Sequence, residues 1–217
     1  MSWSSGKDST MALDVIRRSE DIEVVALLVT MNAEADRVAM HAVRRTLVES
    51  QAERLGLALN FIELPAPCSN EIYELRMSQA LDSALDDGIE HIAFGDLFLQ
   101  DVRSYREKQL AGTGISPLFP LWGQPTDFLA QSMIDSGVQA VVTCVDPAQL
   151  PASFAGRIFD ESLLADLPAD VDPCGERGEF HTFVFGGPGF SSPIDVEIGE
   201  VVERDGFVFC DVEPRFG

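Results

Sequence analysis

Residues 4–31 read SSGKDSTMALDVIRRSEDIEVVALLVTM and contain a small polar loop, a helical pattern and an apolar run in that order. The loop, Ser4 to Ser9, opens directly into a helix predicted over Thr10 to Arg18. The run from Glu23 to Met31 is rich in β-branched residues and predicts a buried strand. A loop, a helix and a strand in succession indicate the first unit of an α/β fold.

Strands and helices go on alternating along the first two thirds of the chain. The further predicted strands are Leu59 to Leu64, His91 to Phe94 and, in a fourth unit, Ala140 to Val145. The further predicted helices are Met40 to Leu55, Ile72 to Leu85 and Asp127 to Ile134. This alternation predicts the α/β class with a doubly wound parallel sheet, whose ligands bind at the carboxyl ends of the strands.

The pattern changes after Asp146 to loops rich in proline and glycine. A short helix is predicted at Glu161 to Ala165 and a strand at Phe180 to Phe185, and Asp205-Gly206 predicts a hairpin turn. The strands predicted for the hairpin are Val196 to Val202 and Phe207 to Val212. We therefore expect a main domain over residues 1–146 and a small C-terminal α+β module over residues 147–217 that ends in a β-hairpin.

Composition and charge restrict the classes of protein and partner. Of the 217 residues, 36 are acidic and 15 basic, and the resulting net charge of -21 disfavours nucleic acid as a partner. The longest uncharged apolar run, Val24 to Met31, falls far short of the roughly 20 residues of a membrane helix, and no basic and apolar leader precedes Ser4. The four cysteines form no Cys-x-x-Cys pair. We expect a cytoplasmic protein with no membrane partner.

The loop at residues 4–9 has the chemistry of an anion site. Backbone N–H groups and the dipole of the following helix converge above the loop, which suits pyrophosphate. Ser5 and Gly6 are small enough to let the backbone approach phosphate, and Lys7 adds a positive charge. The hydroxyls of Ser4 and Ser9 can donate to phosphate oxygens, and Asp8 can either bind magnesium or cap the helix. The Walker spacing Gly-x-x-x-x-Gly-Lys is absent from this loop.

Two later segments place cationic residues at predicted strand ends. His41, Arg44 and Arg45 stand where an anionic substrate can bind, although a polar helix start with solvated arginines explains them equally well. Gly95 can let the backbone approach a nucleotide, and Asp96 can bind ribose or metal. One helical turn separates Arg103 from Arg106, so the two guanidinium groups can clamp a phosphate or carboxylate.

A third segment, Asp172 to Thr182, concentrates reactive groups between glycines. Cys174, Glu176, Glu179 and His181 lie within eight residues, a density that suits acid/base or metal chemistry. The alternative is a turn followed by an edge strand on which His181 is merely exposed. Trp122 can supply an aromatic contact, or it can pack in the core.

These segments together resemble a known family. The loop is similar to the Ser-Gly-Gly-x-Asp-Ser pyrophosphate loop of the N-type ATP pyrophosphatases of the adenine nucleotide α-hydrolase-like superfamily, with Ser5 in place of the middle glycine. Nearly the whole chain resembles the ATP-binding family that contains diphthine–ammonia ligase, and Phe180-His181-Thr182 is similar to its prokaryotic branch. The matching segments are Ser4 to Ser9, Met40-His41-x-Val43-Arg44, Gly95-Asp96, Arg103-x-Tyr105-Arg106-Glu107, Pro120-Leu121-Trp122 and Gly175-Glu176-x-Gly178-Glu179-Phe180-His181-Thr182. The family places a full strand before the loop, where this chain has only Met1-Ser2-Trp3, so we expect a short first strand or a start further upstream.

The resemblance implies an ATP-dependent ligase, in which a substrate carboxylate attacks the α-phosphate, pyrophosphate leaves, and ammonia displaces AMP from the acyl adenylate. It implies ATP and Mg²⁺ as cofactors, with Asp8 as the metal ligand, and a small-molecule or protein carboxylate and ammonia as partners. A homodimer is compatible with it. Residues 1–146 would be the ATP-binding pyrophosphatase-loop domain and residues 147–217 the substrate module. The expected cofactor-binding residues are Ser4, Ser5, Gly6, Lys7, Asp8, Ser9, Gly95 and Asp96. The expected catalytic residues are Lys7, Asp8, Arg103, Arg106, Glu176 and Glu179. The expected substrate-binding residues are His41, Arg44, Tyr105, Trp122 and His181.

Two other functions stay open from the sequence. Members of the same superfamily transfer sulfur to an adenylated base, which requires a reactive cysteine, and Cys174 is the candidate. The other function is that of a non-catalytic adenine-nucleotide-binding protein. We expect that function to show nucleotide binding without release of AMP.

Overall fold

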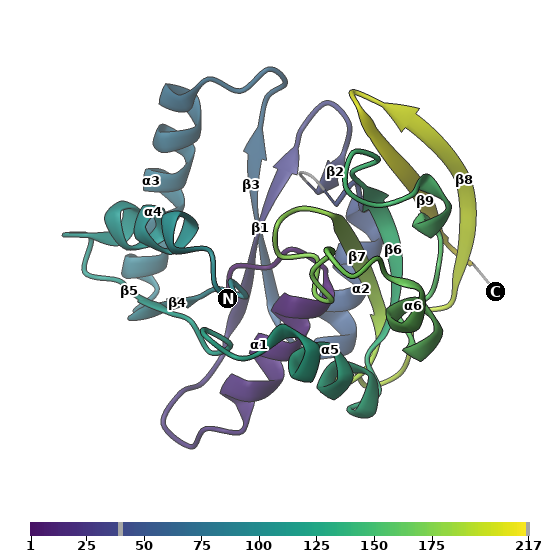
Figure 1. Ribbon diagram of the computed structural model, residues 1–217. Helices are drawn as coiled ribbons and strands as arrows, with labels where there is room; N and C mark the ends of the chain where they lie inside the picture. The colour runs from purple at the N-terminus through teal and green to yellow at the C-terminus, as the bar shows by residue number, and fades with distance from the viewer. Residues whose placement is uncertain (39–40, 216–217) are drawn as a thin grey trace.

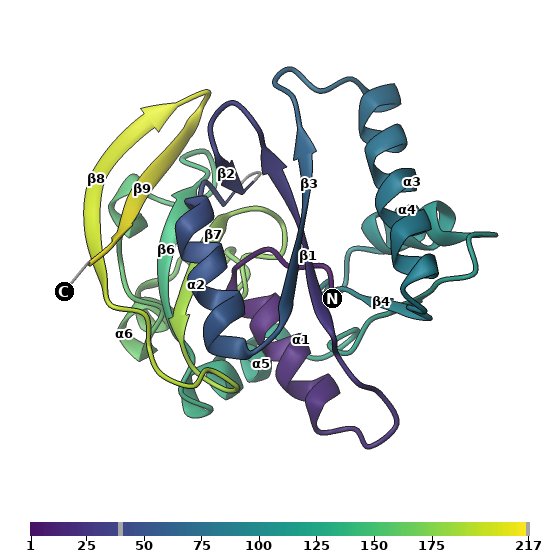
Figure 2. The same cartoon turned by 180° about the vertical axis from the view of Figure 1, so that it is seen from behind.

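A computed structural model describes residues 1–38 and 41–215 of the chain. Figures 1 and 2 show parallel strands in the middle of the molecule, with α3 and α4 on one side and α1, α2 and a second sheet on the other. The helices are α1 (Lys7–Arg17), α2 (Arg45–Leu55), α3 (Asn70–Asp86), α4 (Gln100–Leu110), α5 (Thr126–Asp135), the 3₁₀ turn η1 (Ala152–Phe154) and α6 (Glu161–Asp166). The strands are β1 (Ala26–Asn32), β2 (Arg37–Val38), β3 (Ala58–Leu64), β4 (His91–Ala93), β5 (Ser116–Leu118), β6 (Gln139–Val145), β7 (Phe180–Gly186), β8 (Val196–Arg204) and β9 (Phe207–Pro214).

Two sets of parallel strands meet at the first three residues of the chain. β1 pairs in parallel with β3, and β4 pairs in parallel with β5. Ser2 forms a parallel bridge with Leu28 of β1, and its N–H donates to the carbonyl of Ala93 in β4 at 2.9 Å. Residues 1–3 therefore lie between β1 and β4, in the order β3, β1, residues 1–3, β4, β5. The predicted mixed α/β fold with parallel strands is confirmed.

A second, antiparallel sheet has the order β7-β6-β9-β8. The chain reverses between β8 and β9 at Asp205 and Gly206, whose φ angles are 52° and 84°. β6 pairs antiparallel with β7 and β9, so its expected place as the fourth unit of the parallel sheet is wrong. Six of its seven residues are buried, and an apolar run of this kind suits a central strand of either sheet. The domain boundary expected after Asp146 stays a prediction.

The boundary of α2 differs most from the expected one. The helix begins at Arg45 because Arg44 is extended, with ψ at 143°, and Ala42 has a left-handed φ of 54°. The N–H of Val38 donates to the carbonyl of Val43 at 2.8 Å, a contact that joins β2 to the residue two positions before the helix. Met40, where we expected the helix to begin, lies outside the described residues.

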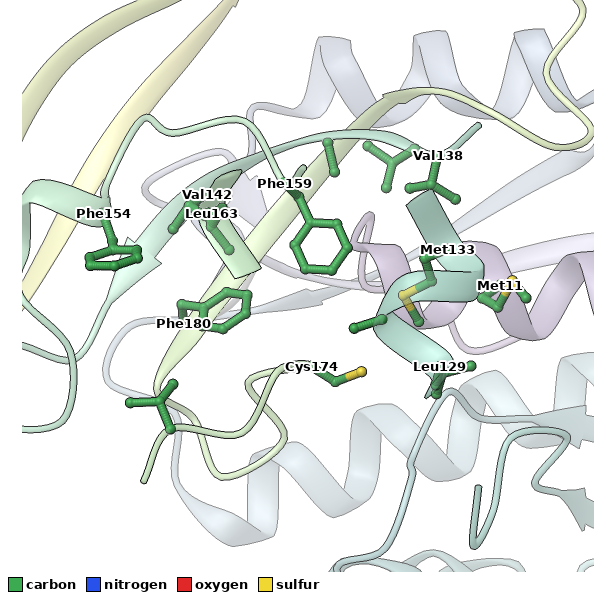
Figure 3. Close-up of a cluster of buried hydrophobic side chains, with 14 of the residues drawn as sticks. Met11, Leu129, Met133, Val138, Val142, Phe154, Phe159, Leu163, Cys174 and Phe180 are labelled. Atoms are coloured by element: carbon green, nitrogen blue, oxygen red, sulfur yellow. The ribbon is translucent and has the colours of Figure 1, made fainter. Parts of the chain in front are cut away.

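Apolar side chains on both faces of the parallel strands hold the layers together. On one face, Leu13 of α1, Val29 of β1 and Val48 of α2 pack with Phe183 of β7. On the opposite face, α3 and α4 pack over β4 in a smaller cluster. A third cluster joins α1 and α5 to β6 and to the loops around Phe159 (Figure 3). Across residues 1–38 and 41–215, the structure contains no helix with the length and apolar character needed to cross a membrane.

Candidate active site

The loop at residues 4–9 follows residues 1–3, which lie between β1 and β4, and enters α1. Gly6 is the N-cap of the helix, and a Cβ atom there would lie 3.0 Å from Cε1 of His41 and 3.1 Å from the carbonyl oxygen of Thr182. Only glycine fits in that space without displacing a neighbour. Ser5 has a left-handed φ of 67°, a conformation that glycine adopts most easily. Ser5 thus has a backbone conformation that favours glycine, and Gly6 lies where a side chain has no room.

Neighbouring elements hold the loop in place. Nε2 of Gln51, on α2, donates to the carbonyls of Ser5 at 3.0 Å and Val184 at 2.6 Å. Oε1 of the same side chain accepts from the indole N–H of Trp3 at 2.8 Å. The N–H of Lys7 donates to Oγ1 of Thr182 at 3.1 Å. These hydrogen bonds therefore fix the loop to Trp3, to α2 and to β7.

A cavity of about 870 Å³ opens beside the loop. It extends from the loop over β1, β3 and β4 to the facing sides of α3 and α4, and β7 forms part of its wall. This volume lies within the usual range for small-molecule sites. Of the expected site residues, those that line it are Ser4, Lys7, Asp8, Ser9, His41, Gly95, Asp96, Tyr105, Arg106, Glu176 and His181.

Lys7 is almost fully buried, at 1% exposure, and its ammonium group has several partners. Nζ lies 2.9 Å from Oδ2 of Asp8, donates to the carbonyl of Cys174, and lies 5.2 Å from the ring centroid of Phe180. Burial lowers the pKa of Lys7, but the contact with Asp8, together with smaller effects of Cys174 and Glu176, outweighs it, so the net pKa is raised and the group stays cationic. Burial raises the pKa of Asp8, against the effect of Lys7. The positive charge lies in the cavity wall beside the helix start.

Gly95 and Asp96 follow β4 and face the same end of α1. A Cβ atom on Gly95 would lie 2.9 Å from the backbone nitrogen of Ser9, so this glycine allows β4 to approach the loop. Oδ2 of Asp96 lies 3.6 Å from Nε of Arg106, and within the described part of the chain neither of these buried atoms has a hydrogen-bond partner. Burial raises the pKa of Asp96, against the effect of Arg106. Two opposite charges thus lie beside the cavity with unused hydrogen-bonding capacity.

The two glutamates of the Gly175 loop differ in position. Glu179 is 2% exposed, and its two oxygens accept from the N–H groups of Asp172 at 3.0 Å and Arg177 at 2.9 Å. It shapes the loop and lies outside the cavity lining. Glu176 lines the cavity, and its Oε1 accepts from the N–H of Leu97 at 2.8 Å. Burial raises the pKa of Glu176 to about 7.

His41 and His181 lie next to each other against the loop. Their ring centroids are 4.5 Å apart, with an interplanar angle of 41°. Nδ1 of His41 lies 3.1 Å from the carbonyl oxygen of Thr182. Burial lowers the pKa of His41 to about 4 and that of His181 well below its ordinary value. His41 is therefore neutral, which does not fit the cationic role expected for it with an anionic substrate.

Six expected site residues lie outside the cavity lining, namely Ser5, Gly6, Arg44, Arg103, Trp122 and Glu179. Arg44 is ion-paired with Asp211 and Glu213 of β9, so acidic side chains take up its charge. Arg103 donates to Glu107 at 2.8 Å and lies 4.8 Å from the ring centroid of Trp122, so it does not form the expected clamp with Arg106. Arg45, considered with His41 and Arg44, is ion-paired with Asp36 and Glu63.

The structure also shows the surroundings of the Cys174 thiol and of the carboxylates that could bind a metal ion. Cys174 is 1% exposed and lies within the apolar cluster of Figure 3, and its burial raises the pKa of the thiol. Among residues 1–38 and 41–215, no group of three or more His, Cys, Asp or Glu side chains is arranged to hold a metal ion. Asp8 and Asp96 both line the cavity, and one or two carboxylates are enough for a Mg²⁺ ion that is also bound by phosphates.

Sequence reasoning missed Gln51 and the part of the cavity wall formed by α3, and on α4 it found Tyr105 and Arg106 but not Gln109. Gln51 occupies an ordinary position in an amphipathic helix, and no sequence pattern distinguishes a buried glutamine from a solvated one. Tyr73 and Glu74 of α3 and Gln109 of α4 also line the cavity. The polar face of each helix was a detectable signal, but the direction of that face depends on how the helices pack.

Comparison with known proteins identifies the family to which the chain belongs. The family model of the diphthamide synthase N-terminal domain matches residues 1–117, and that of the diphthamide synthase C-terminal domain matches residues 125–214. Human diphthine–ammonia ligase is 31% identical over 184 residues, which cover 82% of this chain and 66% of the human protein. The bovine diphthine–ammonia ligase is 32% identical over 129 residues, which cover 57% of this chain and 48% of that protein. The chain thus spans between about half and two thirds of the length of these two relatives. With family models matching both of its halves, the chain belongs to the diphthamide synthase family.

Proposed function

We propose that this protein is an ATP-dependent ligase that adenylates a substrate carboxylate, releases pyrophosphate and forms an amide with ammonia. The observation that carries the proposal is the loop at residues 4–9, which caps α1 and opens into a cavity of about 870 Å³. The relatives named diphthine–ammonia ligase support ammonia as one substrate and a diphthine-like carboxylate as the other. We further propose that residues 1–3 join β1 and β4 into one doubly wound sheet with the loop at its centre.

In this proposal the loop holds the departing pyrophosphate. The hydroxyls of Ser4 and Ser9 lie 3.1 Å apart on the cavity side. The hydroxyl of Ser4 can donate to a phosphate oxygen, and that of Ser9 can do so by giving up its hydrogen bond to the carbonyl of Gly6, at 2.9 Å. Lys7 supplies a fixed positive charge at the start of the helix, which stabilises negative charge as it develops on the leaving group. When bound, ATP supplies an electrophilic phosphorus and a good leaving group. Asp8, with Asp96 opposite, is the proposed ligand of a Mg²⁺ ion that the phosphates share.

The part of the cavity beside α4 is the proposed site of the carboxylate substrate. Arg106 lines the cavity next to Asp96, where its guanidinium can neutralise the attacking carboxylate or the α-phosphate. Tyr105 of α4 and Glu176 also line the cavity and can orient the substrate. We assign Glu179, Arg103 and Trp122 to support of the surrounding loops, because their contacts lie outside the cavity.

The sulfur-transfer alternative is weakened by the position of Cys174. The thiol lies within hydrogen-bonding reach of the carbonyl of Thr126, at 3.4 Å, and it is absent from the cavity lining formed by the described residues. A buried thiol with a raised pKa is a poor nucleophile. The remaining alternative is a protein that binds adenine nucleotides without turnover.

The test follows the products of α-³²P-labelled ATP in the presence of ammonium chloride and a protein that carries diphthine. We expect labelled AMP, together with a 1 Da decrease in the mass of the acceptor, as –OH is replaced by –NH₂. Labelled ADP would contradict cleavage between the α and β phosphates. Nucleotide binding without AMP would favour the binding protein.

Two serine variants separate the role of the loop from a general effect on folding. Ser9→Ala removes a hydroxyl from the cavity, and Ser50→Ala removes a hydroxyl on α2 that bonds the carbonyl of Thr46 at 2.8 Å. A hydrogen bond to a charged group contributes about 1.5–3 kcal/mol, so Ser9→Ala should lower kcat/KM for ATP by roughly one to two orders of magnitude. Ser50→Ala should leave it unchanged. Equal values for the two variants would refute the role of the loop.

A further inference from the structure

The two histidines beside the loop form a small polar end of the cavity. His41 lies between β2 and α2, and His181 lies in β7. The contact between the two rings therefore joins the N-terminal and C-terminal halves of the chain. Cε1 of His41 lies against Gly6, at the position where the loop approaches β7. A molecule that contacts both rings would therefore lie next to the loop.

The contact with Thr182 fixes the tautomer of His41. A carbonyl oxygen can only accept, so Nδ1 of His41, 3.1 Å away, carries the proton and donates it. In a neutral imidazole the other nitrogen, Nε2, then has a lone pair and acts as an acceptor. Among the described residues, no protein donor bonds this Nε2, and His41 lines the cavity.

The surroundings keep both rings neutral and disfavour a cation. The charged group that faces both histidines is the ammonium of Lys7, and His41 further disfavours protonation of His181. A molecule that binds Nε2 of His41 in these surroundings is therefore small and neutral and has an N–H or O–H group to donate. An ammonium ion would be repelled by Lys7, whereas neutral ammonia would not.

We infer that His41 and His181 form the ammonia site, with Nε2 of His41 accepting one N–H of neutral ammonia. The inference rests on the proposed ligase function and specifies where the second substrate binds. An ammonia molecule held by one N–H keeps its lone pair available for attack. The nitrogen forms a bond to the carbonyl carbon, the bond from that carbon to the phosphate oxygen of AMP breaks, and AMP leaves with the electron pair. One proton passes from the nitrogen to water, and the amide remains.

Two substitutions at His41 separate its two ring nitrogens. The amide nitrogen of asparagine overlies Nδ1, so His41→Asn keeps the bond to Thr182 but removes the acceptor in the cavity. Glutamine reaches further, and His41→Gln can place an amide oxygen near the position of Nε2. His91→Asn is the matched control, because His91 is exposed on β4. A neutral hydrogen bond contributes about 0.5–1.5 kcal/mol, so His41→Asn should raise the KM for ammonium roughly twofold to tenfold.

The assay measures AMP formation at varied ammonium chloride, with saturating ATP and a protein that carries diphthine. The expected result is a raised KM for ammonium in His41→Asn, an intermediate KM in His41→Gln, and KM values for ATP within twofold of wild type. A raised KM for ATP with an unchanged KM for ammonium would place the nucleotide at this ring and overturn the inference. Absence of AMP from the wild-type protein would instead refute the ligase function itself.

A measurement on the unaltered protein covers the case in which the variants fail to fold. The chain has three histidines, so ¹⁵N labelling of the imidazoles gives few signals. We expect His41 to show a protonated Nδ1 and an unprotonated Nε2 at pH 7. The opposite tautomer, or a charged ring, would overturn the inference without any assay of activity.

Discussion

Gln51→Leu tests whether one buried side chain on α2 holds the loop in place. Gln51 is fully buried and makes hydrogen bonds with Trp3, Ser5 and Val184. Leucine has a similar volume and suits a helix, so the substitution removes the polar contacts and leaves the packing largely intact. The change in stability should therefore report on the hydrogen bonds.

The magnitude follows from counting these contacts. Three hydrogen bonds at about 1 kcal/mol each amount to about 3 kcal/mol. The indole N–H of Trp3 is then left buried without its partner, which adds about 1 kcal/mol or more. The carbonyl of Ser5 keeps one donor, the N–H of Val184 at 3.0 Å, so it adds little. We expect a loss of about 4 kcal/mol in the free energy of unfolding, or roughly 8–16 °C in Tm for a chain of this length.

Urea unfolding followed by circular dichroism measures the loss. Gln131→Leu is the control, because its hydrogen bond to Asp135 lies on the surface of α5, and it should change stability by less than about 0.5 kcal/mol. Combining Gln51→Leu with Trp3→Phe removes the stranded indole N–H, so the double variant should be more stable than the sum of the single losses by about 1–2 kcal/mol. Losses that simply add, or a Gln51→Leu variant as stable as the control, would refute the reasoning.

Three further substitutions test the backbone angle of Ser5 and the ionisation of Asp211 and Glu176. Ser5→Gly should raise the free energy of unfolding by about 1 kcal/mol, because glycine adopts the φ of 67° without strain; a lower Tm would contradict this. Burial raises the pKa of Asp211, but hydrogen bonds from Arg44 and Arg37 outweigh it and lower the pKa to about 2, so the stability that Asp211 contributes is present above its ordinary pKa and is lost as the pH falls toward 2. In urea titrations at pH 7 and pH 2, Asp211→Asn should be less stable than wild type only at pH 7. Glu176, with a pKa raised by burial to about 7, contributes stability that is lost as the pH rises toward 7, and Glu176→Gln should remove this part of the pH dependence.

Local sequence patterns were enough to predict most elements but not the sheet to which each strand belongs. The run EVVALLVTM predicted β1, and Asp205-Gly206 marks the reversal between β8 and β9. β6 has the same apolar composition as a parallel strand, yet it pairs with β7 and β9. Pairing depends on long-range partners, and an apolar run carries no information about them.

The site shows a similar limit at the level of single residues. Glu176 and Glu179 stand three positions apart in one loop, and their chemical type gives them the same expected role. The fold directs Glu179 inward, onto the N–H groups of Asp172 and Arg177, and leaves Glu176 at the cavity. Arg103 and Arg106 divide similarly, one toward Trp122 and the other toward Asp96. Sequence spacing placed these residues near the site, and side-chain direction decided which of them reach it.

Contacts on several sides position the loop. The N–H of Trp3 donates to the carbonyl of Leu28 at 2.8 Å, and the N–H of Ser2 donates to Ala93 at 2.9 Å, so the backbone is held from both neighbouring strands. The indole of Trp3 is fixed through Gln51, which also bonds Ser5 and β7. The geometry of the loop is therefore set by α2 and β7 as much as by the strand before it. Because β7 also carries His181 and Thr182, any shift of the antiparallel sheet would move the loop and the proposed ammonia site together.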